Sequence, residues 1–218
     1  MVTAPAAHIP RLLGDSKLGP REQARQHLLT IFRGELQSGE HYELRCLDLS
    51  VRPATKGPRL YFRSLTELSD AAIRYREQWD VFFGVGLRRC PVAKDINACP
   101  HRERGRDHIS RLPAAWGDFD LHSDGDREHG LETLVGKLLS GSPPPTVLVA
   151  SGTGIHAYWP LVEPTPDLER VEAVNRSVKR LLGGDNAVDA ARVLRVAGTF
   201  NRKYREPLPV QLLRCPHV

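Results

Sequence analysis

The stretch WGDFDL, residues 116–121, places two aspartates on one hydrophobic strand. Residues two apart in a strand face the same side, so Asp118 and Asp120 present their carboxylates together while Phe119 faces the other way. Two negative charges this close repel each other, and a divalent cation with oxygen ligands relieves the repulsion. The stretch therefore predicts a strand with a metal-binding carboxylate pair, with a solvated strand end as the alternative.

A second segment, ASGTGIHAYW at residues 150–159, runs from a buried strand through a glycine-rich turn to His156. Glycines such as Gly152 let backbone N–H groups approach phosphates closely, and Ser151 and Thr153 add hydroxyl donors. His156 is suited to donate a hydrogen bond to a phosphate oxygen. The segment predicts a phosphate-binding turn, and a plain β-hairpin with a packed histidine is the alternative.

A third segment, GDNAVDAARVLRVAGTFNRK at residues 184–203, supplies acids first and cations afterwards. Its acids are Asp185 and Asp189, and Arg192 and Arg195 begin the cationic part. The two arginines alternate poorly for one strand face, so we expect at least one of them to turn inward. A basic segment exposed to solvent is the alternative.

Helices and strands alternate around these segments, which predicts a mixed α/β or α+β fold. Helical spacing and capping signals predict helices over residues 21–36, 64–78, 128–139 and 167–182. Short apolar or alternating runs predict strands at residues 42–49, 60–62, 81–87, 114–121, 146–150, 155–161, 193–196 and 210–213. Residues 53–58 and 90–110 are predicted loops.

The charge and hydropathy of the sequence indicate which kinds of partner and location to expect. The 31 Lys and Arg outnumber the 26 Asp and Glu, which gives a net charge of +5 and a pI near 9.2. Basic residues cluster at 88–89, 102–106 and 192–205, whereas acids concentrate at 118–128, a separation that suits both phosphates and metal ions. No apolar stretch reaches the roughly 18 residues of a membrane span, and no signal-peptide pattern opens the chain. We therefore expect a cytoplasmic protein without a membrane partner.

The loop at residues 90–110 contains Cys90, Cys99, His101 and His108. In an intracellular chain, cysteines are expected as reduced thiols or metal ligands rather than disulfides. Four ligands of this kind predict a structural zinc ion that would order a loop with no core of its own. The spacing is not that of a standard zinc finger, so free cysteines and unrelated histidines in a basic loop are the alternative.

Taken together, the three segments resemble the motifs of the archaeo-eukaryotic primase superfamily. The closest match is to its bacterial and mobile-element primase-polymerases, of plasmid and CRISPR-associated kinds. The family's first motif is a strand with two acids two residues apart, as at 118–120, and its second is a small residue, any residue and a histidine, as at 154–156. Its third resembles Arg-x-x-Arg-x-Pro-Gly-x-x-Asn-x-Lys, which residues 192–203 match except that Ala197 replaces the proline.

The resemblance implies the family's two-lobed catalytic fold, in which an RRM-like sheet carries the acids. An N-terminal α/β lobe would take residues 1–111, with residues 90–110 as an inserted loop, and the catalytic lobe would take residues 112–218. Family members often continue into a helical primase-associated domain or a helicase, so we expect such a partner outside this chain.

The resemblance also implies an activity, the joining of nucleoside triphosphates to a primer on a single-stranded DNA template. Two Mg²⁺ or Mn²⁺ ions would be held by Asp118, Asp120 and a third acid. The phosphates would be bound by residues of the second and third segments, namely Ser151, Gly152, Thr153, His156, Arg192, Arg195, Asn201 and Lys203.

The third acid has two candidates, because Asp185 and Asp189 both precede Arg192. In related primases this acid sits in a pattern like Asp-x-x-Val, which residues 185–188 match. Asp185 is therefore preferred. The spacing to the basic segment is shorter than in the family, so Asp189 stays open.

Two other functions fit parts of the sequence. A metal-dependent nuclease would use the same two acids, but the glycine-rich turn and the Arg/Lys segment suit a triphosphate better than a phosphodiester. A primase-like module that only binds nucleic acid or nucleotide would have lost the acids or the histidine, and all of them are present here.

Overall fold

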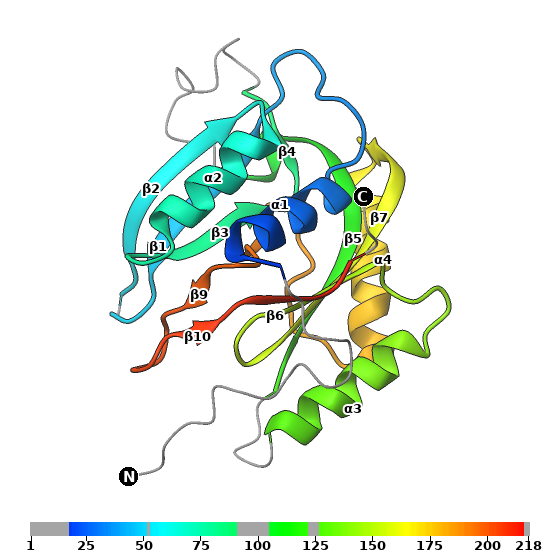
Figure 1. Ribbon diagram of the computed structural model, residues 1–218. Helices are drawn as coiled ribbons and strands as arrows, with labels where there is room; N and C mark the ends of the chain where they lie inside the picture. The colour runs from blue at the N-terminus through cyan, green and yellow to red at the C-terminus, as the bar shows by residue number, and fades with distance from the viewer. Residues whose placement is uncertain (1–17, 52, 91–104, 122–126, 216–218) are drawn as a thin grey trace.

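The computed structural model describes residues 18–51, 53–90, 105–121 and 127–215 (Figure 1). Within these residues the chain forms four α-helices and two antiparallel sheets, which confirms the mixed α/β class. The helices are α1 (Pro20–Ile31), α2 (Leu65–Tyr75), α3 (Arg127–Leu139) and α4 (Leu168–Leu182). None of these helices is long and apolar enough to cross a membrane.

The first sheet has the strand order β2-β1-β3-β8. Its strands are β1 (Tyr42–Asp48), β2 (Thr55–Phe62), β3 (Asp80–Gly84) and β8 (Val193–Arg195). The second sheet has the order β11-β6-β7-β5-β4. Its strands are β4 (Leu87–Arg88), β5 (Ile109–Asp120), β6 (Val147–Ala150), β7 (Gly154–Thr165) and β11 (Gln211–Arg214). A separate hairpin joins β9 (Phe200–Asn201) to β10 (Leu208–Pro209).

Each sheet takes one strand from the other side of residue 111, the predicted boundary between the two lobes. β4 pairs with β5 although it precedes that residue in the chain, and β8 pairs with β3 although it follows it by more than eighty residues. The larger hydrophobic core accordingly contains residues of both sheets, such as Phe83 of β3, Leu194 of β8 and Trp116 of β5. The two sheets are therefore connected by the placement of β4 and β8 and by a common hydrophobic core.

The second sheet is covered on both faces. Val147 and Val149 of β6 point into the larger core, which α1 and α2 complete, whereas Leu148 between them points into a smaller core. α3 and α4 cover that second face, away from α1 and α2 (Figure 1). Phe119 belongs to the smaller core, so the predicted alternation of WGDFDL is confirmed: Phe119 is buried there and the two aspartates face the opposite side.

Most predicted elements are present, with differences at their ends. α1 ends at Ile31 rather than at residue 36, because the chain leaves helical geometry at Phe32 and Gly34 adopts a φ of 81°. β2 begins at Thr55, so the loop predicted at 53–58 is wrong from residue 55 onward, where pairing with β1 overrides the turn signals of Gly57 and Pro58. The hairpin of β9 and β10 was not predicted, because strands of two residues leave no periodic signal.

Gly198 occupies a position that only glycine fits well. Its φ is +82°, and a Cβ atom there would overlap the carbonyl oxygen of Pro20 at the start of α1. Its own N–H donates to the Val210 carbonyl at 2.7 Å, which fixes the crossing of two chain segments. Gly183 at the end of α4 has a similar φ of +83° but open space around it.

We predict that Gly198→Ala lowers the free energy of unfolding by at least about 3 kcal/mol, because left-handed strain and a backbone clash add. Gly183→Ala suffers the strain alone and should cost about 1–2 kcal/mol. Equilibrium urea unfolding followed by circular dichroism measures both. Equal losses for the two variants would contradict the role given to the Pro20 contact.

Candidate active site

The pairing of β5 with β7 brings the first two sequence segments together. In this antiparallel register Asp118 lies opposite His156, and Asp120 lies opposite Gly154. The Nε2 atom of His156 is 3.4 Å from Oδ1 of Asp118. A Cβ atom on Gly154 would overlap the carbonyl oxygen of Phe119, so a glycine is needed where the turn meets the acidic strand.

The beginning of the third segment packs against the same strand. The Asp185 N–H donates to the Asp118 carbonyl at 2.7 Å. Two further hydrogen bonds hold this segment: the Trp116 indole N–H donates to the Ala187 carbonyl at 2.5 Å, and the Asn175 amide donates to the Val188 carbonyl at 3.4 Å. The backbone of residues 185–188 is thereby fixed beside the two aspartates.

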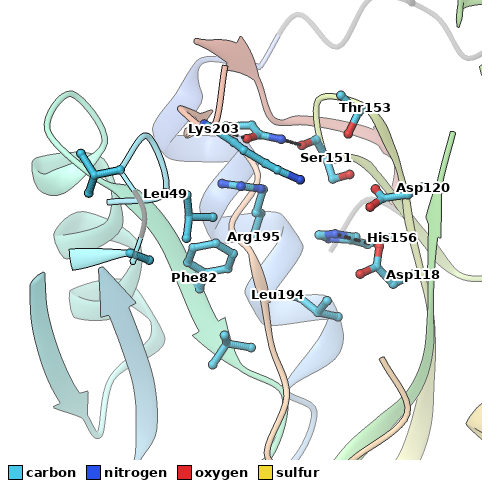
Figure 2. A pocket seen from close by; sticks show the side chains of 14 residues that line it. Leu49, Phe82, Asp118, Asp120, Ser151, Thr153, His156, Leu194, Arg195 and Lys203 are labelled. Carbon is cyan, nitrogen blue, oxygen red and sulfur yellow. Dashed lines mark hydrogen bonds and ion pairs between the residues drawn. The ribbon is translucent and has the colours of Figure 1, made fainter. Parts of the chain in front are cut away.

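A cleft of about 390 Å³ opens where the segments meet (Figure 2). Its lining residues come from the acidic strand, the glycine-rich turn, the third segment and the first sheet: Leu49, Val51, Ala54, Phe82, Asp118, Asp120, Ser151, Thr153, His156, Val193, Leu194, Arg195, Asn201 and Lys203. Figure 2 shows the acids and His156 on one side, with Arg195 and Lys203 facing them. Leu49 and Phe82 form part of an apolar wall beyond.

Most of the residues predicted for the site line this cleft, and four do not. Gly152 is part of the turn itself, where its φ of +103° shapes the backbone. Asp185 contacts the acidic strand through its backbone. Asp189 is half-exposed and pairs with Arg192 at 2.8 Å, and Arg192 also donates to the Asn186 carbonyl. Of the two arginines, Arg195 is therefore the one that turns inward.

The carboxylates repel each other in a partly buried setting. Burial, and then the charge of Asp185, raise the pKa of Asp118 to about 6. Burial and the charges of Asp118 and Asp185 also raise the pKa of Asp120. Asp189 contributes to neither shift. The third acid whose charge raises the pKa of both aspartates is thus Asp185, which a backbone hydrogen bond to Asp118 holds beside them.

The acidic side of the cleft has the chemistry of an open cation site. Oδ1 of Asp118 is buried and, among the described residues, accepts no well-formed hydrogen bond. No three Asp, Glu, His or Cys side chains of the described chain enclose an ion by themselves. Mg²⁺ and similar ions commonly bind one or two protein carboxylates and take their other ligands from phosphates and water. The residues present fit a cation of this kind.

His156 is a neutral side chain. Burial, and then the nearby Arg195, lower its pKa to about 3, so the contact with Asp118 is not an ion pair at neutral pH. Its Nδ1 atom lies 3.4 Å from the Tyr158 hydroxyl. With that hydroxyl donating to Nδ1, the proton sits on Nε2, on the side of the acids.

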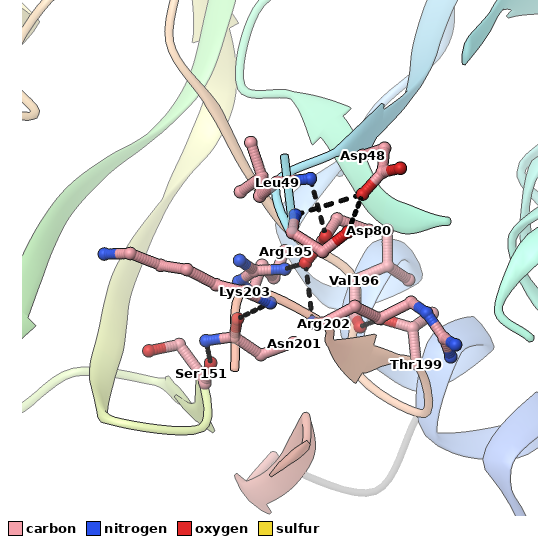
Figure 3. Close-up of polar contacts among 11 residues, drawn as sticks. Asp48, Leu49, Asp80, Ser151, Arg195, Val196, Thr199, Asn201, Arg202 and Lys203 are labelled. Atoms are coloured by element: carbon pink, nitrogen blue, oxygen red, sulfur yellow. Dashed lines mark hydrogen bonds and ion pairs between the residues drawn. The ribbon is translucent and has the colours of Figure 1, made fainter. Parts of the chain in front are cut away.

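Asp80 is a central residue of the site that the sequence analysis missed (Figure 3). It is fully buried and forms an ion pair with Arg195, whose guanidinium also stacks over Phe82 at 4.7 Å. Asp80 further accepts hydrogen bonds from the backbone N–H groups of Leu49, at 3.3 Å, and Arg202, at 2.9 Å. The Asp80 carboxylate thus connects Leu49, Arg195 and Arg202, which come from three separate stretches of the chain around the cleft. An acid at the head of the apolar run 81–87 was the available signal, because a buried acid needs partners.

Asn201 joins the turn to the third segment. Its amide donates to the Ser151 carbonyl at 3.0 Å, and its Oδ1 accepts from the Lys203 N–H at 3.2 Å. Both ends of the side chain are therefore engaged within the protein. Asn201 positions Ser151 and Lys203 at the rim of the cleft.

One of the four predicted zinc ligands, Cys90, is not available as a thiolate. Cys90 is disulfide-bonded, whereas Cys46 and Cys215 are free. The expectation of reduced thiols is therefore wrong for Cys90, and a disulfide sulfur does not provide the thiolate that zinc binds. His108 is described and buried, but Cys99 and His101 lie outside the described residues.

Comparison with known proteins identifies the fold. No protein-family model and no curated protein matches the chain. Among solved structures, the AEP domain of the primase-polymerase of cyanophage S-2L is 20% identical, with a TM-score of 0.61, over 89% of this chain and 90% of that one. The catalytic domain of primase RepB′, solved with initiator DNA, is 14% identical with a TM-score of 0.58, over 90% and 85%.

A further structure of primase RepB′ gives a TM-score of 0.57 at 14% identity, and the match covers 56% of that longer chain. These likenesses show that the chain has the fold of archaeo-eukaryotic primases, as the three segments predicted.

We predict that Asp118→Asn stabilises the metal-free protein at pH 8. Folding raises the pKa of Asp118 from 3.8 to about 6, so the ionised form destabilises the folded state above pH 6 and this penalty disappears as the pH falls to 4. The gain should be on the order of 1–2 kcal/mol at pH 8 and near zero at pH 4. Urea unfolding in the presence of a chelator measures it, with the exposed Asp107→Asn as control. A loss of stability at pH 8 would contradict the prediction.

Proposed function

Because the chain has this fold, we propose that it is a nucleotidyltransferase that joins nucleoside triphosphates on a DNA template. The observation that carries the proposal is the charge distribution of the cleft, in which acids and cations face each other (Figure 2). A nucleoside triphosphate with its divalent cation has the complementary distribution, because the phosphates need cations on one side and the metal needs carboxylates on the other.

Asp118, Asp120 and Asp185 are the residues we expect to hold Mg²⁺ or Mn²⁺. The unsatisfied oxygen of Asp118 and the mutual repulsion of the acids support this assignment. Asp185 is preferred to Asp189, whose carboxylate is paired with Arg192. When bound, such ions lower the pKa of an attacking 3′-hydroxyl group and stabilise the charge of the triphosphate.

The opposite side of the cleft would bind the triphosphate. Arg195 is held rigidly between Asp80 and Phe82, so its charge needs no reorganisation when a phosphate arrives. Lys203 reaches the cleft from the exposed rim. His156 would donate its Nε2 proton to a phosphate oxygen, and the hydroxyls of Ser151 and Thr153 would add neutral donors from the glycine-rich turn.

DNA is the proposed template and primer. The structural relative RepB′ was solved in complex with initiator DNA, and the mild basic excess of this chain suits a polyanionic partner. The same two acids would also serve a nuclease, so the test must distinguish a strand that grows from one that shortens.

We expect the purified chain to extend a labelled primer on single-stranded template with nucleoside triphosphates and Mn²⁺. Asp118→Asn combined with Asp120→Asn should reduce extension by about 10³-fold or more, because a cation site worth several kcal/mol is lost. The control, Glu77→Gln with Glu169→Gln, removes two exposed acids outside the cleft. Shortening of the primer, or full extension by the Asp118/Asp120 variant, would refute the proposed function.

The choice of third acid has its own test. Asp185→Asn should reduce primer extension at least about 100-fold, whereas Asp189→Asn, which removes a half-exposed partner of Arg192, should stay within about fivefold of the unmodified protein. Comparing the Mn²⁺ concentration needed for half-maximal extension separates a weakened metal site from a general loss. The reverse order of effects would make Asp189 the third acid.

A further inference from the structure

The turn between β9 and β10 forms a second polar surface beside the cleft. This 202–207 turn contains Arg202, Lys203 and Arg205, with Glu206 as its acid. A depression of about 260 Å³ lies against it, lined by Ser50, Arg202, Lys203, Tyr204, Arg205 and Pro207. Lys203 lines both this depression and the cleft, so the two adjoin at that residue.

The backbone of the turn is anchored while its cationic side chains remain available. Asp80 accepts from the Arg202 N–H at 2.9 Å and Asn201 from the Lys203 N–H at 3.2 Å. In the described part of the chain, no carboxylate forms a close ion pair with Arg202, Lys203 or Arg205. Two acids lie within electrostatic reach of these cations: Asp48, whose carboxyl accepts from Ser50 and whose pKa Arg202 helps to lower, and Asp120, on whose pKa Lys203 has a lowering effect.

Tyr204 distinguishes this surface from a simple basic patch. Its side chain is 38% exposed, although large aromatic groups are usually buried, and Lys203 Nζ lies 6.0 Å from its ring centroid. Cations that follow a phosphate backbone, combined with an exposed aromatic ring, are the features that bind single-stranded nucleic acid, because unpaired bases stack on such rings. An acidic peptide would use the cations but would have no use for the ring.

We propose that the 202–207 turn binds single-stranded DNA, with its arginines on the phosphates and Tyr204 stacked on a base, and thereby leads the strand to the cleft. The inference rests on the proposed function, because a templated reaction needs a strand to reach the site. The binding of the strand does not itself depend on catalysis. Rigid anchoring through Asp80 and Asn201 keeps that path in register with Arg195 and Ser151.

Strand binding is measured by fluorescence anisotropy of a labelled oligothymidylate, with a chelator present and no nucleotide. For the unmodified protein, we expect the logarithm of affinity to fall linearly with the logarithm of salt concentration. Arg202→Ala with Arg205→Ala should reduce the magnitude of that slope by about 1.4, at about 0.7 for each lost phosphate contact. The control, Arg176→Ala with Arg180→Ala, removes two exposed arginines of α4 and should leave the slope unchanged.

The stacking part is tested by a matched pair of variants. Tyr204→Ala should weaken oligothymidylate binding about fivefold or more, whereas Tyr204→Phe keeps the ring and should bind normally. Binding of a duplex of the same length should not differ between the two.

The outcomes separate the two proposals. Failure of the unmodified protein to bind the strand, an unchanged slope in the Arg202/Arg205 variant, or equal affinity of the two Tyr204 variants would overturn the strand-binding inference. Polyglutamate bound as tightly as oligothymidylate would overturn it in favour of an acidic peptide. If the protein binds the strand as expected but extends no primer, the proposed activity is refuted and the strand-binding inference still holds.

Discussion

The register between β5 and β7 is the constraint on which the rest of the site depends. Asp118 faces His156 only because Trp116 pairs with Tyr158 in the larger core and Phe119 pairs with Ile155 in the smaller one. A slip of one residue would exchange the two faces of the strand and bury a carboxylate in apolar surroundings. Large side chains packed on both faces therefore hold the polar atoms in position.

A second constraint comes from behind the cleft. A buried guanidinium is unstable without a counter-ion, and Asp80 supplies it to Arg195 from the neighbouring strand. The same carboxylate accepts from Leu49 and Arg202, so the apolar wall, the inward cation and the basic turn share one support. Among the described residues, no Arg or Lys forms an ion pair with Asp118 or Asp120, and the repulsion between these acids remains as a local cost that a cation would relieve.

Sequence patterns predicted the parts of the site that are local. Period-two spacing was enough to predict that Asp118 and Asp120 share one face of a strand. A glycine-rich turn after an apolar run was enough to predict Ser151 and His156 as residues of the candidate site. Contacts between distant segments left no such pattern. Asp80 meets Arg195 only because β3 pairs with β8, and the docking of residues 185–188 on β5, which supports the earlier preference for Asp185 over Asp189, likewise depends on contacts between distant segments. The disulfide of Cys90 likewise could not be read from spacing.

The late return of β8 to the first sheet has a consequence for how the protein is made. During synthesis β1, β2 and β3 emerge early, yet the edge of β3 stays unpaired until residues 193–195 follow. Such distant pairing slows folding and leaves an open strand edge for misassembly in the meantime. Since β8 also delivers Arg195 to the cleft, the ribosome must synthesise the chain to residue 195 before the nascent chain can close its first sheet.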